Sequence, residues 1–190
     1  MDKTNETAFI QSISENQYIR EYCKNNPPPA NFSDILSYYQ EHKSVNGVKD
    51  TEDMKLFCSF MKNNERASNF VIQEYDSFGT DMGHSVLVTA DKDVYVAFDG
   101  TNDKEWEDNG VGMYSKATDQ QNAAARVFDK YMTAYGITED NNVVVTGHSK
   151  GGNKAMFVTM AAGKSYLIDN CIALDGQGFS PEAIKAWKDE

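Results

Sequence analysis

Apolar residues recur at helical spacing through residues 1–65. Ile10, Ile13, Tyr18, Ile19 and Tyr22 follow this spacing, and the prolines of residues 27–29 should end the helix that carries them. Ser33 and Thr51 stand where N-caps of two further helices are expected. The pattern therefore predicts a helical N-terminal segment.

The hydrophobic period changes after this segment, and strands and helices then follow in turn. Short β-branched and aromatic runs predict strands, and longer amphipathic runs predict helices. Strands are expected at residues 70–75, 85–89, 94–98, 143–146 and 167–174, with helices at 118–135, at 150–162 and from Ser180-Pro181 onward. A tight turn at residues 91–93 should join the second and third strands, and the run 143–146 is typical of a strand buried on both faces.

The order of these elements predicts an α/β fold in a single domain, residues 1–190. Strand–helix–strand–helix order in the second half implies a parallel sheet with crossover helices. At 190 residues the chain is long enough to bury one substantial core.

The charge of the chain excludes several classes of partner. The formal net charge is −11, and no basic stripe is present, which argues against nucleic acid and against docking on anionic lipid. No run of about 18 apolar residues predicts a membrane-spanning helix. The N-terminus lacks a signal-peptide pattern, so a cytoplasmic protein is expected unless another route exports it. We see no metal-ligand spacing and no phosphate loop, and therefore expect no cofactor and no metal.

The candidate chemistry lies at Gly147-His148-Ser149-Lys150-Gly151, which fits the pattern G-x-S-x-G. It joins a Val-rich strand to an amphipathic helix, the context in which a nucleophilic serine sits on a strained turn. Glycines on either side let neighbouring backbone approach, and the helix N-terminus directs N–H groups at a developing oxyanion. The Lys150 N–H is one expected donor. An idle serine on a glycine-rich turn is the alternative.

A second expected donor follows the strand at residues 94–98. That strand runs into Asp99-Gly100-Thr101, and a turn ahead of the serine is where such enzymes place the other half of the oxyanion hole. Thr101 is the candidate. The following segment, residues 102–116, is expected either to cover the site or to pack as an ordinary surface loop.

These segments resemble a known family. VYVAFDGTNDKEWEDN, NNVVVTGHSKGGNKAMFVTMAA and CIALDGQGFSPEAI are similar to the class 3 lipase-like family, in particular its bacterial Mbeg-like branch, over residues 69–184. The resemblance implies an α/β-hydrolase-like, mostly parallel sheet with flanking helices, truncated at its C-terminal side. It also implies Ser149 as nucleophile and Thr101 with Lys150 as the oxyanion hole, with Trp106 and Asp108 as supports. The family usually has Arg where this chain has Asp99, so a supporting ion pair should be missing or reversed.

The general base is the weak point of this prediction. A serine needs a base within hydrogen-bonding reach, and no histidine follows Ser149. His148 is expected to point away from the serine into neighbouring packing. His42 is expected to be solvated, and His84 could serve only in an unusual chain order. Asp175, after the strand at 167–174, is a candidate acid or else the start of a Gly-rich turn.

Two functions remain open. The first is a lipase-like or esterase-like serine hydrolase acting on a small-molecule or lipid ester, incomplete or weakly active for lack of a base. The second is a non-catalytic pseudo-hydrolase that binds a partner, since a fold can outlive its activity. An open sheet edge makes a homo-oligomer a further possibility.

Overall fold

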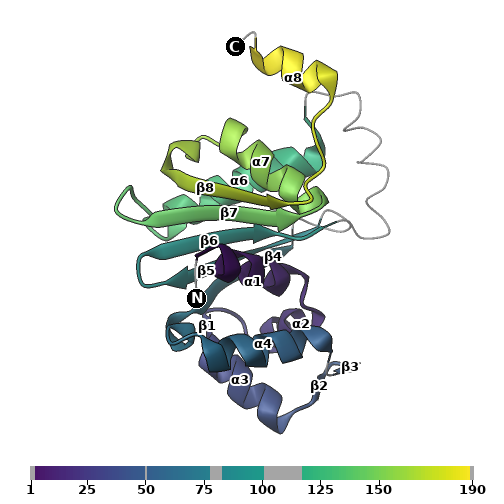
Figure 1. Ribbon diagram of the computed structural model, residues 1–190, viewed down its shortest axis with the longest axis vertical. Coiled ribbons are helices and arrows are strands. Elements are labelled where there is room, and N and C mark those ends of the chain that lie inside the picture. Colours follow the sequence, from purple (N-terminus) through teal and green to yellow (C-terminus); the bar gives the residue numbers. More distant parts are fainter. Residues whose placement is uncertain (1–2, 50, 78–82, 101–116, 189–190) are drawn as a thin grey trace.

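The computed structural model describes residues 3–49, 51–77, 83–100 and 117–188. Its main feature is a six-stranded sheet in the order β1-β4-β5-β6-β7-β8 (Figure 1). The strands are β1 (Ala30–Asn31), β4 (Val71–Ser77), β5 (His84–Ala90), β6 (Asp93–Phe98), β7 (Asn142–His148) and β8 (Ile168–Leu174). The α/β class with flanking helices is confirmed.

The sheet is mixed rather than mostly parallel. β6, β7 and β8 run parallel, which confirms the crossover arrangement predicted for the second half. The pairs β1–β4, β4–β5 and β5–β6 are antiparallel. The β5–β6 pair is antiparallel because the turn between these strands, where Asp91 takes a positive φ of 57°, is too short to join parallel neighbours.

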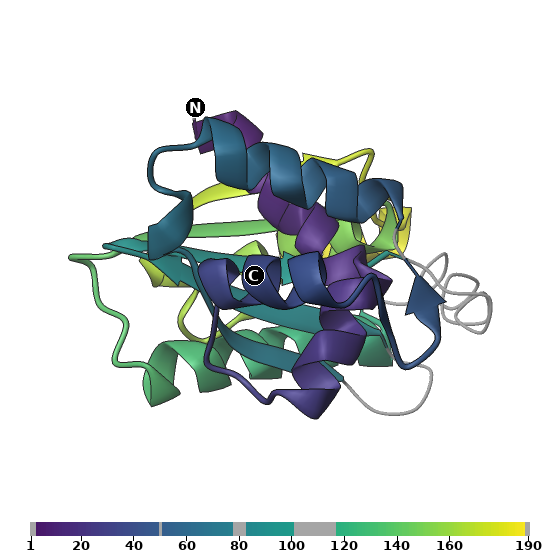
Figure 2. The same ribbon diagram turned by 90° about the horizontal axis from the view of Figure 1, so that it is seen from below.

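Helices cover both faces of this sheet (Figure 2). The first face carries α1 (Lys3–Glu15), α2 (Gln17–Asn25), α3 (Phe32–Glu41) and α4 (Glu52–Asn63). The second face carries α6 (Asp119–Ala134) and α7 (Lys150–Ala161). The remaining elements are the hairpin β2 (Ser44–Val45) and β3 (Val48–Lys49), the 3-10 turns η1 (Ala67–Asn69) and η2 (Ser165–Leu167), and the final helix α8 (Pro181–Lys188).

Side-chain alternation along the central strands builds two separate cores. On β6, Tyr95 and Ala97 face the N-terminal helices, whereas Val96 and Phe98 face α6 and α7. β7 is likewise buried on both faces, as predicted. Every residue of β6 is buried, because the strand lies in the middle of the sheet between two helical layers.

The N-terminal segment is helical, as predicted, but its first helix is broken. The side chain of Asn16 accepts a hydrogen bond from the Ile19 N–H at 3.0 Å and so caps a new helix, α2. α3 begins at Phe32 with Asn31 at the cap position, so the expectation of a Ser33 cap was wrong. Thr51 and Ser180 do stand immediately before α4 and α8.

The turn from β7 to α7 is built by backbone-to-backbone contact. A Cβ on Gly147 would lie 2.2 Å from the Gly151 carbonyl carbon, and a Cβ on Gly151 would lie 2.2 Å from the Phe98 carbonyl oxygen. Neither neighbour is a side chain that can rotate away. Gly151 is therefore a condition for seating α7 against the end of β6, and Gly147 is a condition for the tight turn between β7 and α7.

We predict that Gly151→Ala lowers the free energy of unfolding by about 3 kcal/mol, because the new methyl group overlaps main-chain atoms that cannot relax alone. Gly178→Ala is the matched control, since nothing lies within 4 Å of a Cβ there and no positive φ is involved. It should change stability by less than about 0.5 kcal/mol. Urea denaturation of both variants measures the difference, and equal midpoints would contradict the steric account.

Candidate functional site

Ser149 occupies the single residue between β7 and α7 in a strained backbone conformation. Its φ is 53° and its ψ is −116°, a region that residues with a side chain seldom adopt. Two main-chain hydrogen bonds join it to the segment at and after the end of β8. Its N–H donates to the Leu174 carbonyl at 2.9 Å, and its carbonyl accepts from the Gln177 N–H at 3.3 Å. The end of β8 therefore holds the serine in this conformation.

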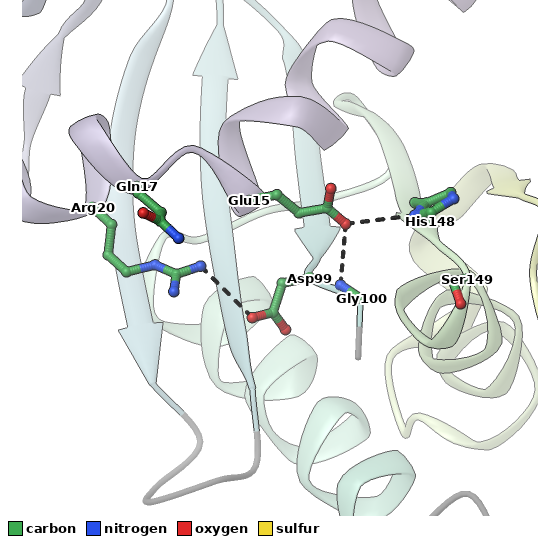
Figure 3. Close-up of a pocket in the computed structure, with 7 residues that line it drawn as sticks. All are labelled: Glu15, Gln17, Arg20, Asp99, Gly100, His148 and Ser149. Atoms are coloured by element: carbon green, nitrogen blue, oxygen red, sulfur yellow. Dashed lines mark hydrogen bonds and ion pairs between the residues drawn. The ribbon is translucent and has the colours of Figure 1, made fainter. Parts of the chain in front are cut away.

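Ser149 lines a pocket of about 360 Å³ at the carboxyl ends of β6 and β7 (Figure 3). The carboxyl edge is where α/β sheets usually hold their ligands. Besides Ser149, the pocket is lined by Asp99 and Gly100 after β6, by His148 at the end of β7, and by Glu15, Gln17 and Arg20 from the end of α1 and the start of α2. The N-terminal residues had not been predicted to belong to the site.

α7 begins directly behind Ser149. The first residues of a helix have N–H groups without intrahelical partners, and these favour negative charge at the helix N-terminus. The Lys150 N–H stands at that position, as the sequence predicted. The lysine side chain itself is buried.

Asn153 fixes the first turn of α7 to two neighbouring elements. Its side-chain oxygen accepts a hydrogen bond from Gln121 Nε2 on α6 at 2.7 Å, and its Nδ2 donates to the Gln177 carbonyl at 3.0 Å. The Asn that ends the Lys-Gly-Gly-Asn run therefore has a structural role next to the turn.

Asp99 is the centre of a buried ion cluster at the end of β6. Its carboxylate accepts hydrogen bonds from the His84 N–H at 2.8 Å and from Lys154 Nζ at 3.3 Å, and Arg20 lies 3.8 Å away. The Lys154 side chain is fully buried. Of the two expected arrangements, a missing or a reversed ion pair, the structure has the reversed one, with the acid directly after β6 and cations on α2 and α7.

This environment fixes the protonation state of Asp99. Burial by itself would raise the pKa of the carboxyl group, but the hydrogen bonds from His84 and the charge of Lys154 outweigh that effect. The pKa of Asp99 therefore lies below its ordinary value, and the group is ionised at neutral pH.

Glu15 projects into the pocket from the last position of α1. Its Oε1 accepts a hydrogen bond from the Gly100 N–H at 3.2 Å and lies 3.7 Å from His148 Nδ1. The side chains of Glu15 and His148 are 41% and 48% exposed. His148 is therefore at the surface of the pocket, and the expectation that it packs away from the site was wrong. At the end of β7, backbone alternation carries it outward beside α1.

The other predicted residues are not assembled around the serine. The ring of His84 lies 3.1 Å from Asp99 Oδ2 and lines a neighbouring pocket, not that of Ser149. Asp175 follows β8 with a φ of 47° and is exposed, as expected for the start of a Gly-rich turn. No described residue forms a hydrogen bond with the Ser149 hydroxyl. Thr101, Trp106 and Asp108 lie outside the described residues.

In the described ranges, no helix has the length and apolar character needed to cross a membrane. Nor do these residues bring three or more His, Cys, Asp or Glu side chains into a possible metal site.

We predict that Asp99→Asn lowers the free energy of unfolding at pH 7 by about 3 kcal/mol, because Lys154 would remain buried without its counter-charge. The pKa of Asp99 is lowered in the folded state, so its stabilising effect is complete above the unfolded pKa of about 3.9. The effect is lost as pH falls through the folded pKa. The difference in the free energy of unfolding between wild type and variant should therefore become smaller below about pH 4.

Asp140→Asn is the matched control for this measurement, because Asp140 is exposed and its carboxylate makes no ion pair with any residue that the structure describes. Its effect should stay below about 0.5 kcal/mol. Guanidinium denaturation at several pH values gives the comparison. A penalty for Asp99→Asn that is the same at pH 3 and pH 7 would contradict the ion-cluster account.

Comparison with known proteins places these features in a family. The model of the Mbeg1-like family matches residues 61–188. No curated protein matches the chain. Among solved structures, a fungal lipase–inhibitor complex is 15% identical, with a TM-score of 0.45, covering 85% of this chain and 54% of that one. Rhizomucor miehei lipase with its propeptide is also 15% identical, with a TM-score of 0.49. That match covers 98% of this chain and 56% of the lipase chain.

The chain thus spans little more than half the length of these two lipases. The family match, in contrast, takes in most of the chain, including the whole sheet apart from β1 and the turn that carries Ser149. The chain belongs to the Mbeg1-like family.

Proposed function

We propose that this protein is a serine ester hydrolase of lipase or esterase type, with Ser149 as its nucleophile. One observation carries the proposal: Ser149 takes a strained conformation between β7 and α7 and lines a pocket at the carboxyl edge of the sheet. A strained serine in a strand-to-helix turn is the arrangement of a nucleophile elbow. Since such strain costs on the order of 1–3 kcal/mol, its presence needs a reason, and exposure of the hydroxyl supplies one.

The proposed chemistry is acyl transfer. Ser149 Oγ attacks the ester carbonyl carbon and loses its proton to a base, and the carbonyl oxygen becomes an oxyanion. The Lys150 N–H at the start of α7 stabilises this charge, with Thr101 as the proposed second donor. Collapse of the intermediate releases the alcohol and leaves an acyl-enzyme, which water then hydrolyses.

The missing part of this mechanism is a positioned base. His84 is engaged by Asp99, and Asp175 does not line the pocket. Oxyanion stabilisation and binding still accelerate such reactions on the order of a thousand-fold over water without a complete triad. We therefore expect this chain by itself to be a slow esterase.

The same observation supports a second candidate, a non-catalytic binding protein that retains the elbow geometry. No described residue is placed to deprotonate Ser149, and a pocket with polar walls can bind a ligand without reacting. The two candidates differ in whether a covalent acyl-enzyme forms.

We predict that p-nitrophenyl acetate gives a burst of about one equivalent of p-nitrophenol, followed by slower turnover, because p-nitrophenolate is a good leaving group and acylation is therefore faster than hydrolysis of the acyl-enzyme. Ser149→Ala should abolish the burst and lower the steady rate at least about tenfold. Ser68→Ala, at an exposed position on the 3-10 turn η1, should behave like the wild type. Stopped-flow absorbance measures both phases. A burst of unchanged size in Ser149→Ala would contradict the proposal, and the absence of any turnover would favour the binding protein.

A further inference from the structure

The wall of the pocket opposite the sheet comes from the N-terminal helices. Glu15, Gln17 and Arg20 belong to the α1–α2 junction, which precedes the part of the chain matched by the family model. This part of the site is therefore specific to the N-terminal segment of the chain and is distinct from the turn that carries the serine.

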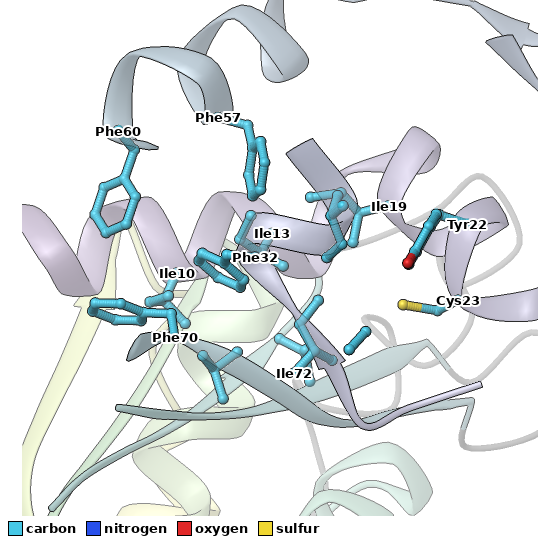
Figure 4. Packing of buried hydrophobic residues seen from close by; sticks show 14 of the residues in the cluster. Ile10, Ile13, Ile19, Tyr22, Cys23, Phe32, Phe57, Phe60, Phe70 and Ile72 are labelled. Atoms are coloured by element: carbon cyan, nitrogen blue, oxygen red, sulfur yellow. The ribbon is translucent and has the colours of Figure 1, made fainter. Parts of the chain in front are cut away.

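The fold holds this junction firmly in place. Ile10, Ile13 and Ile19 on either side of it are fully buried against Phe32 and Phe57 (Figure 4). The Asn16 cap fixes the direction in which α2 leaves α1. The polar side chains of the junction are thus presented by rigid elements, as a specificity-determining wall requires.

No purely hydrocarbon side chain is among the described residues that line the pocket. Each of the described lining residues is either glycine or carries a polar or charged side chain. A pocket for a hydrocarbon chain is lined mainly by apolar side chains, because only these compensate for removing it from water. The described wall therefore favours a ligand with polar groups of its own.

The charges of the pocket are unevenly distributed. Asp99 faces two cations, Lys154 and Arg20, so that end of the pocket carries a net positive charge. Arg20 also donates to the Ser14 carbonyl at 3.2 Å. Glu15 accepts from a neutral backbone N–H, and its one charged neighbour among the described residues is His148, if that ring is protonated. Negative potential is therefore concentrated at the end of the pocket that holds Glu15 and His148, the residue before Ser149.

We propose that Glu15 makes this pocket select esters that carry an ammonium group close to the scissile carbonyl. The proposal rests on the proposed function and adds a substrate class to it. The carboxylate attracts the cation, and Gln17 offers hydrogen bonds to neighbouring polar groups. An anionic group next to the carbonyl is repelled by the same charge.

The expected preference is modest, because Glu15 is partly exposed and its field is screened by water and salt. A charge pair at such a site changes affinity by about fivefold at low ionic strength. The preference should decrease as salt is added.

The test compares acetylthiocholine with its uncharged isostere, 3,3-dimethylbutyl thioacetate, so that the two esters differ in charge and not in shape. The readout is the ratio of the two kcat/KM values. In the wild type this ratio should be about five. In Glu15→Gln it should fall to about one, because glutamine keeps an oxygen to accept the Gly100 N–H and loses only the charge.

Glu139→Gln is the matched control. It changes the net charge equally, but Glu139 is exposed and precedes the start of β7, at the opposite end of the strand from Ser149. The ratio of the two kcat/KM values in Glu139→Gln should equal that of the wild type. Because the ratio cancels any general loss of activity, damage to the site by the substitution does not imitate the predicted result. A wild-type ratio near one, or an unchanged ratio in Glu15→Gln, would overturn the inference.

Choline binding separates this inference from the proposed function. Choline contains the cation but no ester, so its binding, followed by isothermal titration calorimetry, requires no catalysis. Its dissociation constant should be about fivefold higher for Glu15→Gln than for the wild type and for Glu139→Gln. If neither ester is hydrolysed, the proposed function fails while this measurement still decides the role of Glu15. Equal dissociation constants for choline in all three proteins would refute the proposed role of Glu15.

Discussion

The main-chain contact between the first turn of α7 and the end of β6 is the constraint on which the rest of the site depends. Gly151 allows that contact, because a Cβ there would lie 2.2 Å from the Phe98 carbonyl oxygen, and Gly147 lets the same turn close onto the end of β7. With α7 seated there, Ser149 adopts a positive φ and lies at the carboxyl edge of the sheet. The pocket, the helix N-terminus behind the serine and the position of Asp99 all follow from this one close approach.

The charged groups around the turn have two different roles. Asp99 and Lys154 join β6 to α7 in the interior, where a charge is tolerated only with its partner. Glu15, in contrast, is partly exposed and faces the pocket. The Asp99–Lys154 pair therefore affects the stability of the fold, whereas Glu15 is placed to affect which ligand the pocket binds. The ion pair at this position has its acid directly after β6 and its cations on α2 and α7.

Local signals in the sequence were sufficient for most elements and for the position of Ser149 in a turn between a strand and a helix. The Val-rich run of β7, the glycines on either side of Ser149 and the amphipathic pattern of α7 are all short-range features, and each gave a correct prediction. The turn at Asp91 was also foreseen, although the antiparallel pairing that it enforces was overlooked. The break at Asn16 was missed because an asparagine within an apolar repeat gives only a weak cap signal.

The residues that complete the pocket could not be predicted, because they are distant in sequence. Glu15 reaches Gly100 across 85 residues, and Lys154 reaches Asp99 across 55. Their meeting depends on how α1 crosses the sheet and how α7 packs on it, which no local pattern encodes. The exposure of His148 was missed for a related reason, since its surroundings are provided by α1 and not by the turn to which it belongs.

The most direct test of the central claim, that the β7–α7 turn makes Ser149 a reactive nucleophile, is to map the adduct of a fluorophosphonate probe by peptide mass spectrometry. The account predicts one stoichiometric adduct, on Ser149, formed slowly because no described base is hydrogen-bonded to its hydroxyl. An adduct on another residue, or no adduct at Ser149 after prolonged exposure of the folded protein, would contradict it.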